Sequence, residues 1–159
     1  MTANTEPTPF SEEQHRALAR AIDEIIPASA DGRLPGAGDA DVTRYIEAAL
    51  RPTPMLIEMV VESLNALETL AGQRHSRNFL ALARSTQSEL LQALAMSEHA
   101  LPPVIMIHTF AGYYQSPRVL EALGLESRSP HPKGYVMQPN DLTLLDPVRQ
   151  RRRVYRTTS

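Results

Sequence analysis

Prolines that stand beside helix-capping residues constrain the fold of this chain more than any other feature. The 159-residue sequence contains 13 prolines, and a proline inside a helix removes a backbone donor and clashes with the preceding turn. Thr53-Pro54 and Ser116-Pro117 each pair a capping residue with the proline that helices favour in their first turn. Pro102-Pro103 begins a further apolar run, and Pro27 ends an earlier one. These positions divide the chain into short segments.

Apolar residues recur at helical spacing within these segments. Ser11 is expected to cap the first helix with Gln14 at its third position, and Leu18 and Ile22 lie on its buried face. Further helices are expected over about 42–50 after an Asp cap, from 54 to about 71, near 79–83, from a Ser85 cap to about 94, over 103–114, and over 117–123 with Gly124 as the C-terminal cap. No strand-like alternation persists, so the sequence predicts an all-α fold.

The length of the chain fits one domain, because domains cluster at about 100–150 residues. We expect a single small helical domain of about six helices over residues 11–124, preceded by a flexible N-terminus over residues 1–10. Residues 125–159 are expected to form an extended, proline-rich tail with a basic end. The prolines that interrupt any regular element there are Pro130, Pro132, Pro139 and Pro147.

Charge is spread unevenly along the chain, although the net charge is only −2. Residues 1–70 hold 12 acidic and 5 basic side chains, whereas residues 71–159 hold 6 acidic and 11 basic ones. The last eleven positions include five arginines, which are Arg149, Arg151, Arg152, Arg153 and Arg156. Such a separation of charge along the chain suits docking to a partner. The alternative interpretation is that the arginines form a solvated tail. The near-neutral total disfavours nucleic acid as the partner.

The sequence contains no recognisable catalytic, metal or cofactor-binding residues. The absence of cysteine excludes disulfides, thiol nucleophiles, thiolate zinc sites and cysteine-held iron–sulfur clusters. The five histidines form no helical ligand pair, and the spacing of Asp31, Asp39 and Asp41 does not match a calcium loop. The glycines of Pro35-Gly36-Ala37-Gly38 lack the dinucleotide-binding spacing, and there is no P-loop or G-x-S-x-G motif.

Two segments are candidates for contact with a partner. The loop over residues 27–41 is long for a compact domain, and loops of that length are often functional. The apolar helix that ends in Gly112-Tyr113-Tyr114 is hydrophobic all round, so it is either central or placed at an interface. Because adjacent tyrosines point about 100° apart on a helix, at least one of them is expected to leave the core. Two interpretations of the tyrosines remain open: they contact a partner, or their hydroxyls form hydrogen bonds within the fold.

No apolar run approaches the roughly 20 residues of a spanning helix. The N-terminal residues are polar and acidic, without the basic start and apolar stretch of a secretory signal. We therefore expect a cytoplasmic protein without a membrane span, with a periplasmic location beside a partner as the alternative.

Several segments together resemble the gluconate 2-dehydrogenase subunit 3 family, over roughly residues 11–136. The first is Asp23-Glu24-Ile25-Ile26-Pro27, which is similar to the D-x-I-I-P of the family. Other similar segments are Pro35-Gly36-Ala37, Val42 with Tyr45-Ile46, Phe79 with Leu82 and Leu90-Leu91, Gly112-Tyr113-Tyr114 with Pro117 and Leu123-Gly124, and Gly134-Tyr135. Members of this family are small helical subunits that accompany FAD-dependent sugar and alcohol dehydrogenases of the glucose-methanol-choline class.

The resemblance implies a non-catalytic accessory subunit that binds and stabilises the catalytic subunit of such a dehydrogenase and helps its maturation or export. FAD is then expected in the partner of a heterodimer, and no cofactor in this chain. The residues expected to bind the partner are Pro35, Gly36, Gly112, Tyr113, Tyr114, Pro117, Gly134 and Tyr135. Many members carry a twin-arginine export signal, which this sequence lacks. A free-standing helical protein that binds a small ligand or a regulatory partner is the alternative.

Overall fold

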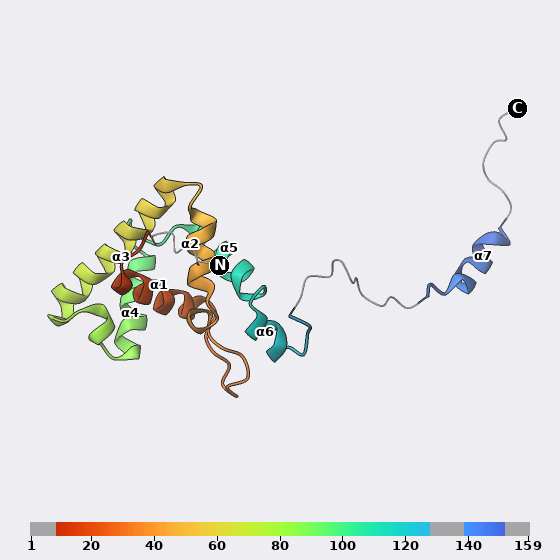
Figure 1. Ribbon diagram of the computed structural model, residues 1–159, viewed down its shortest axis with the longest axis horizontal. Helices are drawn as coiled ribbons and strands as arrows, with labels where there is room; N and C mark the ends of the chain where they lie inside the picture. The colour runs from red at the N-terminus through yellow and green to blue at the C-terminus, as the bar shows by residue number, and fades with distance from the viewer. Residues whose placement is uncertain (1–8, 128–138, 152–159) are drawn as a thin grey trace, which may run out of the picture. The chain divides into compact units, whose positions relative to one another are not determined.

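The computed structural model describes residues 9–127 and 139–151, and it divides the chain into two units, residues 1–128 and 129–159. All regular elements of the described residues are helical, which confirms the all-α prediction (Figure 1). The elements of the first unit are α1 (Glu12–Ile25), η1 (Ala37–Asp39), α2 (Val42–Leu50), α3 (Pro54–His75), η2 (Phe79–Ala81), α4 (Arg84–Ala95), α5 (Pro103–Tyr113) and α6 (Pro117–Ala122). Those of the second are η3 (Leu142–Leu145) and α7 (Asp146–Arg149).

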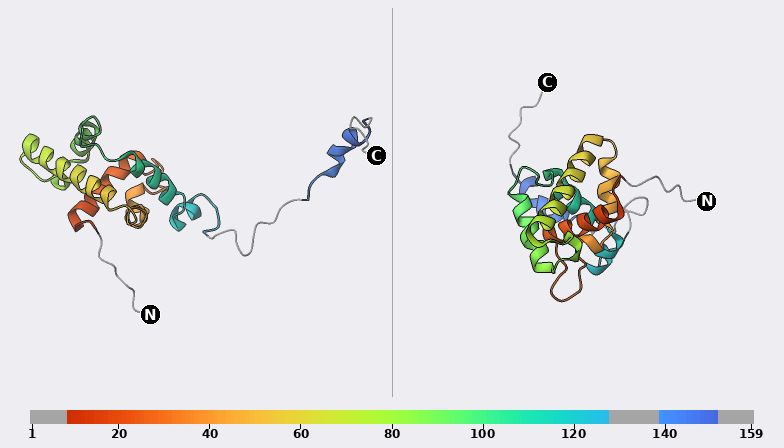
Figure 2. Two further views of the ribbon diagram at one scale, coloured as in Figure 1. Left: turned by 90° about the horizontal axis from the view of Figure 1, so that it is seen from above. Right: turned by 90° about the vertical axis from the view of Figure 1, so that its left-hand side faces the viewer.

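Helix α1 lies at the centre of the first unit and packs against α2, α3 and α5, while α4 runs beside α3 (Figure 2). The side chains of Leu18 and Ile22 on α1 are fully buried. They belong to the larger of two apolar clusters, which extends into α2, the start of α3, α5 and α6. The smaller cluster joins the second half of α3 to Phe79 and to the buried face of α4. The first unit thus has two neighbouring cores that share α1 and α3.

The predicted helix ends are mostly confirmed. Ser11 and Gln14 form a reciprocal capping box at the start of α1, and prolines open α3, α5 and α6. Thr53 and Ser116 occupy the expected positions before α3 and α6, but the side chain of neither makes a capping bond. Gly124 has a φ of +73° and ends α6 with two backbone bonds, from Gly124 N to Glu121 O and from Leu125 N to Leu120 O. This pair of bonds is the Schellman arrangement, which requires the left-handed conformation that glycine adopts without strain.

Three predictions about the ends of elements are wrong. Ser85 does not cap α4, because Ala83 takes the capping position two residues earlier and Ser85 lies inside the first turn of the helix. Asp41 does precede α2, but it has a left-handed φ of 57° and its side chain makes no capping bond. Phe10, which we assigned to a flexible N-terminus, is buried in the larger cluster because its ring is one of the apolar groups that fill it.

The segment predicted to be extended after residue 124 contains helical structure. The Asp141 carboxylate accepts bonds from the backbone N–H of Thr143 at 3.1 Å and from its hydroxyl at 2.6 Å, which starts η3. Pro147 stands in the first turn of α7, where its missing donor has no helical partner to lose. A proline therefore opens this helix instead of preventing it. Residues 128–138, which include Gly134 and Tyr135, lie outside the described residues.

Candidate partner-binding surface

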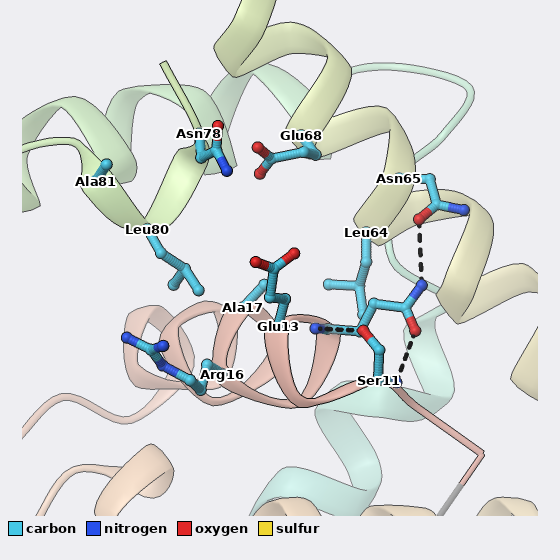
Figure 3. Close-up of a pocket in the computed structure, with 11 residues that line it drawn as sticks. Ser11, Glu13, Arg16, Ala17, Leu64, Asn65, Glu68, Asn78, Leu80 and Ala81 are labelled. Atoms are coloured by element: carbon cyan, nitrogen blue, oxygen red, sulfur yellow. Dashed lines mark hydrogen bonds between the residues drawn. The ribbon is translucent and has the colours of Figure 1, made fainter.

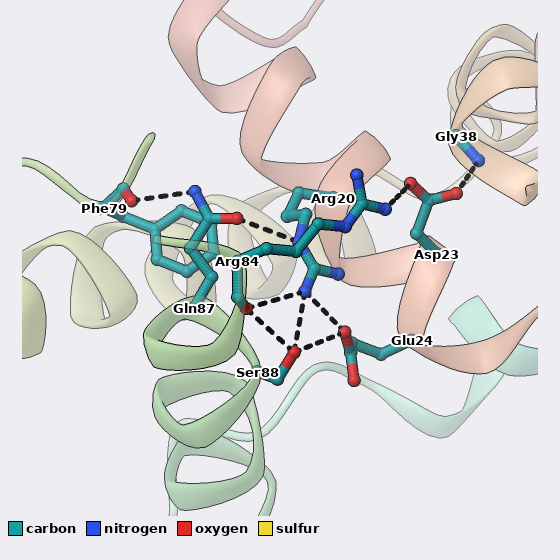
Figure 4. Close-up of polar contacts among 8 residues, drawn as sticks. All are labelled: Arg20, Asp23, Glu24, Gly38, Phe79, Arg84, Gln87 and Ser88. Atoms are coloured by element: carbon teal, nitrogen blue, oxygen red, sulfur yellow. Dashed lines mark hydrogen bonds and ion pairs between the residues drawn. The ribbon is translucent and has the colours of Figure 1, made fainter. Parts of the chain in front are cut away.

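Asp23 at the end of α1 holds the loop that follows it. Its Oδ1 accepts a hydrogen bond from the backbone N–H of Gly38 at 2.8 Å, and its Oδ2 pairs with the Arg84 guanidinium at 2.9 Å (Figure 4). A second link runs from the Ala37 N–H to the Ile26 carbonyl at 2.9 Å. The D-x-I-I-P segment and the P-G-A segment are therefore parts of one structure, in which a carboxylate and a carbonyl fix the loop backbone.

Two of the three glycines of this loop, Gly36 and Gly38, are placed where a side chain would not fit. A Cβ on Gly38 would lie 2.6 Å from the backbone carbonyl oxygen of Ala19, and a Cβ on Gly36 would collide with the Asp23 carboxylate. Both positions therefore allow the loop backbone to lie directly on α1. The longest exposed stretch of the loop is its tip, over residues 30–33.

Tyr113, the last residue of α5, is also bonded to this loop. Its side chain is 3% exposed, and its hydroxyl donates to the Pro35 carbonyl at 2.9 Å. Burial, with a smaller contribution from the neighbouring Tyr114, raises the pKa of the Tyr113 hydroxyl above its ordinary value of 10.0. The hydroxyl therefore remains a donor under ordinary conditions. Of the two interpretations left open for the tyrosines, internal hydrogen bonding applies to Tyr113.

Tyr114 points out of the core at the helix end and is 56% exposed. Its ring meets that of Tyr113 edge to face, with centroids 5.3 Å apart, so the buried ring supports the exposed one. Three further large apolar side chains of α5 are exposed beside it in the helical order 106, 107, 110 and 114. We call these four the outer face of α5, which comprises Met106, Ile107, Phe110 and Tyr114.

An exposed apolar helix face of this kind is unusual on a protein that acts alone, because such patches commonly mark sites of association. Aromatic residues and methionine are also enriched at the centres of protein interfaces. The opposite side of α5, formed by Ile105, Thr109, Gly112 and Tyr113, is buried. The prediction that this helix is central is thus confirmed for its inner face, and the interface on its outer face stays a prediction.

A hollow of about 490 Å³ adjoins the end of α5 and the start of α6. Gly112 and Pro117 line it, as do Asp39, Asp41 and Arg118. Arg118 donates to the Asp39 carbonyl at 3.0 Å, which ties α6 to η1. Gly112 is required here because a Cβ would come within 2.8 Å of the Tyr45 ring. This hollow holds charged groups of both signs at the end of α5, on the side of Gly112.

A second hollow of about 380 Å³ lies between α1, α3 and η2 (Figure 3). Most of its polar groups already have partners within the fold. Gln14 bonds to Ser11 and to the Asn65 amide oxygen at 3.2 Å, and the Glu68 carboxylate accepts from the backbone N–H of Phe79 at 3.0 Å. The hollow is thus lined by groups that cap and join helices, and we assign it no ligand.

A polar network joins α1 to α4 behind the loop. The Arg20 guanidinium, almost fully buried, donates to the Gln87 side chain at 2.9 Å and to the Ser88 hydroxyl at 2.8 Å, and pairs with Glu24 (Figure 4). Burial alone would raise the pKa of Glu24, but hydrogen bonds from Ser88 and Arg20 and the charges of Arg20 and Arg84 outweigh it and hold this pKa below the ordinary 4.5. The network fixes the orientation of α4.

The structure sorts the eight predicted partner-binding residues into three groups. Pro35, Gly36, Gly112 and Tyr113 are buried and hold the loop and α5 together. Tyr114 and Pro117 are exposed. Gly134 and Tyr135 lie outside the described residues.

Sequence reasoning did not single out Met106, Ile107 and Phe110. The signal for them was the uniform hydrophobicity of 103–114, because a helix that is apolar all round has an apolar side that faces away from its own core.

Within the described parts of the chain, no group of three His, Asp or Glu side chains is arranged to hold a metal ion. The helices described there include none that is both long and apolar enough to cross a membrane.

Comparison with known proteins gives one match. The family model described as gluconate 2-dehydrogenase subunit 3 matches residues 12–126. The chain belongs to the gluconate 2-dehydrogenase subunit 3 family. The matched segment contains α1 to α6 and the outer face of α5, so this surface belongs to the family domain. Neither a curated protein nor a solved structure matches the chain.

Proposed function

We propose that this member of the gluconate 2-dehydrogenase subunit 3 family is the accessory subunit of an FAD-dependent sugar or polyol dehydrogenase. It binds the catalytic subunit, stabilises the folded form of that subunit and assists its maturation. The family match supports membership of a dehydrogenase complex. In this proposal FAD and the oxidation chemistry reside in the partner, which belongs to the glucose-methanol-choline class.

The observation that carries the proposal is the outer face of α5. Four large apolar side chains on one helix face solvent, and a rigid buried core lies directly beneath them. A preformed surface loses little conformational freedom on binding, so more of its apolar contact appears as affinity. A partner that binds only the folded catalytic subunit also raises the stability of that subunit by mass action.

The hollow beside Arg118 and Pro117 completes the proposed interface. Its charged groups lie at the end of α5, and polar contacts commonly accompany the apolar centre of an interface. The exposed tip of the 27–41 loop is a further contact in this proposal. We propose that assembly takes place in the cytoplasm, and fractionation of cells that express both chains would distinguish this from assembly after export to the periplasm.

The test is purification of the tagged full chain from its native host, with an absorption spectrum and mass spectrometry of the eluate. The account predicts that a protein of flavoenzyme size co-purifies and that the eluate shows flavin absorption bands. The triple variant Ile107→Glu, Phe110→Glu and Tyr114→Glu should reduce the co-purified flavoprotein at least tenfold, because three carboxylates would be desolvated at an apolar contact.

The matched control places the same three charges on another exposed part of the molecule, as Gln92→Glu, Ala95→Glu and Met96→Glu. This control should retain the flavoprotein, and circular dichroism should show native helicity in both variants. A wild-type chain that elutes colourless and alone would contradict the accessory role. A triple variant that binds as well as the control would contradict the assignment of the surface.

A further inference from the structure

The hollow at the end of α5 contains two carboxylates that the described part of the chain does not neutralise. Asp39 and Asp41 both line it, and both residues are exposed. Neither carboxylate makes a hydrogen bond or an ion pair with any residue that the structure describes. Arg118 lines the same hollow, but its guanidinium donates to the Asp39 backbone carbonyl at 3.0 Å and pairs with neither carboxylate. The lining therefore keeps an excess of negative charge.

A buried hydroxyl without a partner opens into the same hollow. Ser116 is 8% exposed, and its side chain makes no capping bond and no bond to any other described residue. Among the described side chains, the buried polar atom that lacks both a partner and contact with solvent is Nη1 of Arg20. The Ser116 hydroxyl therefore still reaches solvent, through the hollow that this residue lines. Because buried polar groups ordinarily have a partner, this hydroxyl is an acceptor that awaits a ligand.

An aromatic ring is also part of the lining. Tyr45 lines the hollow and packs so closely on Gly112 that a Cβ there would lie 2.8 Å from the ring. The ring also meets that of His108, with centroids 6.2 Å apart. A guanidinium or ammonium group is attracted to the face of such a ring, and both groups carry N–H donors and no acceptor. Carboxylates, a hydroxyl and an aromatic ring therefore suit the same kind of ligand, which is a positively charged nitrogen group.

Other ligands fit this lining less well. An anion would meet two carboxylates, and the described residues contain no group of three His, Asp or Glu side chains that could hold a metal ion. A partner that covers the hollow also removes Asp39 and Asp41 from water, and a desolvated carboxylate without a counter-charge is costly. Such a partner must therefore supply a cation of its own.

We infer that the hollow binds a basic side chain, a lysine or an arginine, of the catalytic subunit, an inference that rests on the proposed function. The charged group of that side chain pairs with the carboxylates of Asp39 and Asp41 and donates a hydrogen bond to the Ser116 hydroxyl. Complementary charges across an interface fix the orientation of the partners and exclude wrong ones. The hollow thus supplies charge recognition, whereas the outer face of α5 supplies apolar contact.

The test purifies the tagged full chain from a native host in which it replaces the untagged copy, and measures flavin absorbance per tagged chain. Asp39→Asn with Asp41→Asn removes both charges and keeps the shape of the side chains. This variant should recover about tenfold less flavoprotein at 50 mM salt, because a basic side chain of the partner would be covered without its counter-charge. A wash at 500 mM salt should remove more flavoprotein from the wild type than from this variant, because salt screens charge pairs.

The matched control is Glu62→Gln with Glu89→Gln, which removes two exposed charges from α3 and α4 and should retain the flavoprotein. Ser116→Ala separates binding from folding, because the hydroxyl makes no bond to the described residues. It should leave the unfolding midpoint unchanged and lower the recovery of flavoprotein about threefold, since the bound group loses an acceptor. A lower midpoint with unchanged recovery would show that this hydroxyl serves the fold and would contradict its place in the site.

Each other outcome overturns the inference in a distinguishable way. Equal recovery with the two double variants would show that the hollow does not bind the partner, while the accessory role would stand. Recovery that EDTA abolishes and CaCl₂ restores would identify a divalent cation as the occupant. If methylguanidinium chloride shifted the NMR signals of residues 39–41 while the Asp39→Asn, Asp41→Asn variant kept its flavoprotein, the ligand would be a free cation. A wild-type chain that recovers no flavoprotein would remove the proposed function and this inference together.

Discussion

Helix α5 presents one apolar side to the interior of the first unit and another to solvent. On the inner side, Ile105 is 1% exposed and Tyr113 donates to the Pro35 carbonyl. On the outer side, Ile107 is 65% exposed and Tyr114 stands beside it. The inner side holds Gly112 and Tyr113 of the family-like segment, whereas the outer side holds Tyr114 of that segment beside three residues outside it, all four proposed to bind a partner. Motif residues can therefore report on the fold while the adjacent, less distinctive residues carry the interaction.

The largest expected difference between the two sides is in stability. Ile105→Ala should lower the free energy of unfolding by about 3 kcal/mol, since it removes buried methylene groups and leaves a cavity. Ile107→Ala should change it by less than about 0.5 kcal/mol, because the site is exposed. Denaturant unfolding followed by circular dichroism measures both. Equal losses for the two variants would break the distinction between the sides.

A half-buried and an exposed glycine can be compared in the same way, one in the 27–41 loop and one in α3. Gly38→Ala should cost about 2 kcal/mol, because its Cβ would lie 2.6 Å from the fixed carbonyl oxygen of Ala19. The matched change Gly72→Ala has open space around it within α3 and should raise stability by about 0.5–1 kcal/mol through helix propensity. If Gly38→Ala were neutral in the same unfolding assay, the loop would not be fastened to α1 as described.

Substitutions of Tyr113 and Tyr114 should change the free energy of unfolding less, and the contribution of Tyr113 should depend on pH. Tyr113→Phe should lower the free energy of unfolding by about 1–2 kcal/mol, because the buried Pro35 carbonyl loses its donor, and Tyr114→Phe should change it by less than about 0.5 kcal/mol. The pKa of Tyr113 is raised in the folded state, so its stabilisation is present below about pH 10 and is lost as the pH rises above that value. The stability of the wild type should therefore fall more steeply than that of Tyr113→Phe between pH 9 and 11 in urea titrations.

The smallest effect concerns Glu24 in the network around Arg20. Its pKa is lowered in the folded state, so its stabilisation is present above about pH 4.5 and is lost as the pH falls through the folded-state pKa. Glu24→Gln should thus be less stable than the wild type at pH 7 and approach it at pH 3. Thermal midpoints across this range measure the difference, and a gap that widened in acid would contradict the assigned sign.

Sequence patterns predicted the helices of the first unit because their determinants are local. A proline at a helix start or a capping box at Ser11 acts within one turn. The start of α4 was misplaced at Ser85 because a capping serine is only one of the groups that can precede a helix. The helical structure within 139–151 was missed because proline was interpreted as a breaker, although Pro147 stands where a helix tolerates it.

The candidate surface was predicted only in part, because the contacts that arrange it join residues far apart in the sequence. The hydroxyl of Tyr113 finds its acceptor at Pro35, 78 residues away, and no local pattern encodes that pairing. Two adjacent tyrosines are equivalent in the sequence, and only the packing of α5 decides which of them is buried. Resemblance to the family identified the motif segments, but it could not separate residues that hold the fold from residues on the surface.

Methionine oxidation in the assembled complex tests the central claim most directly. Met106 lies on the outer face of α5 and is 51% exposed, while Met96 is 89% exposed and lies outside that face. Brief treatment with hydrogen peroxide followed by mass spectrometry reports the accessibility of each sulfur. The account predicts that both are oxidised in the free chain and that the co-purified dehydrogenase subunit protects Met106 at least fivefold while leaving Met96 unchanged. Equal oxidation of Met106 in the free chain and in the complex would contradict the proposed interface.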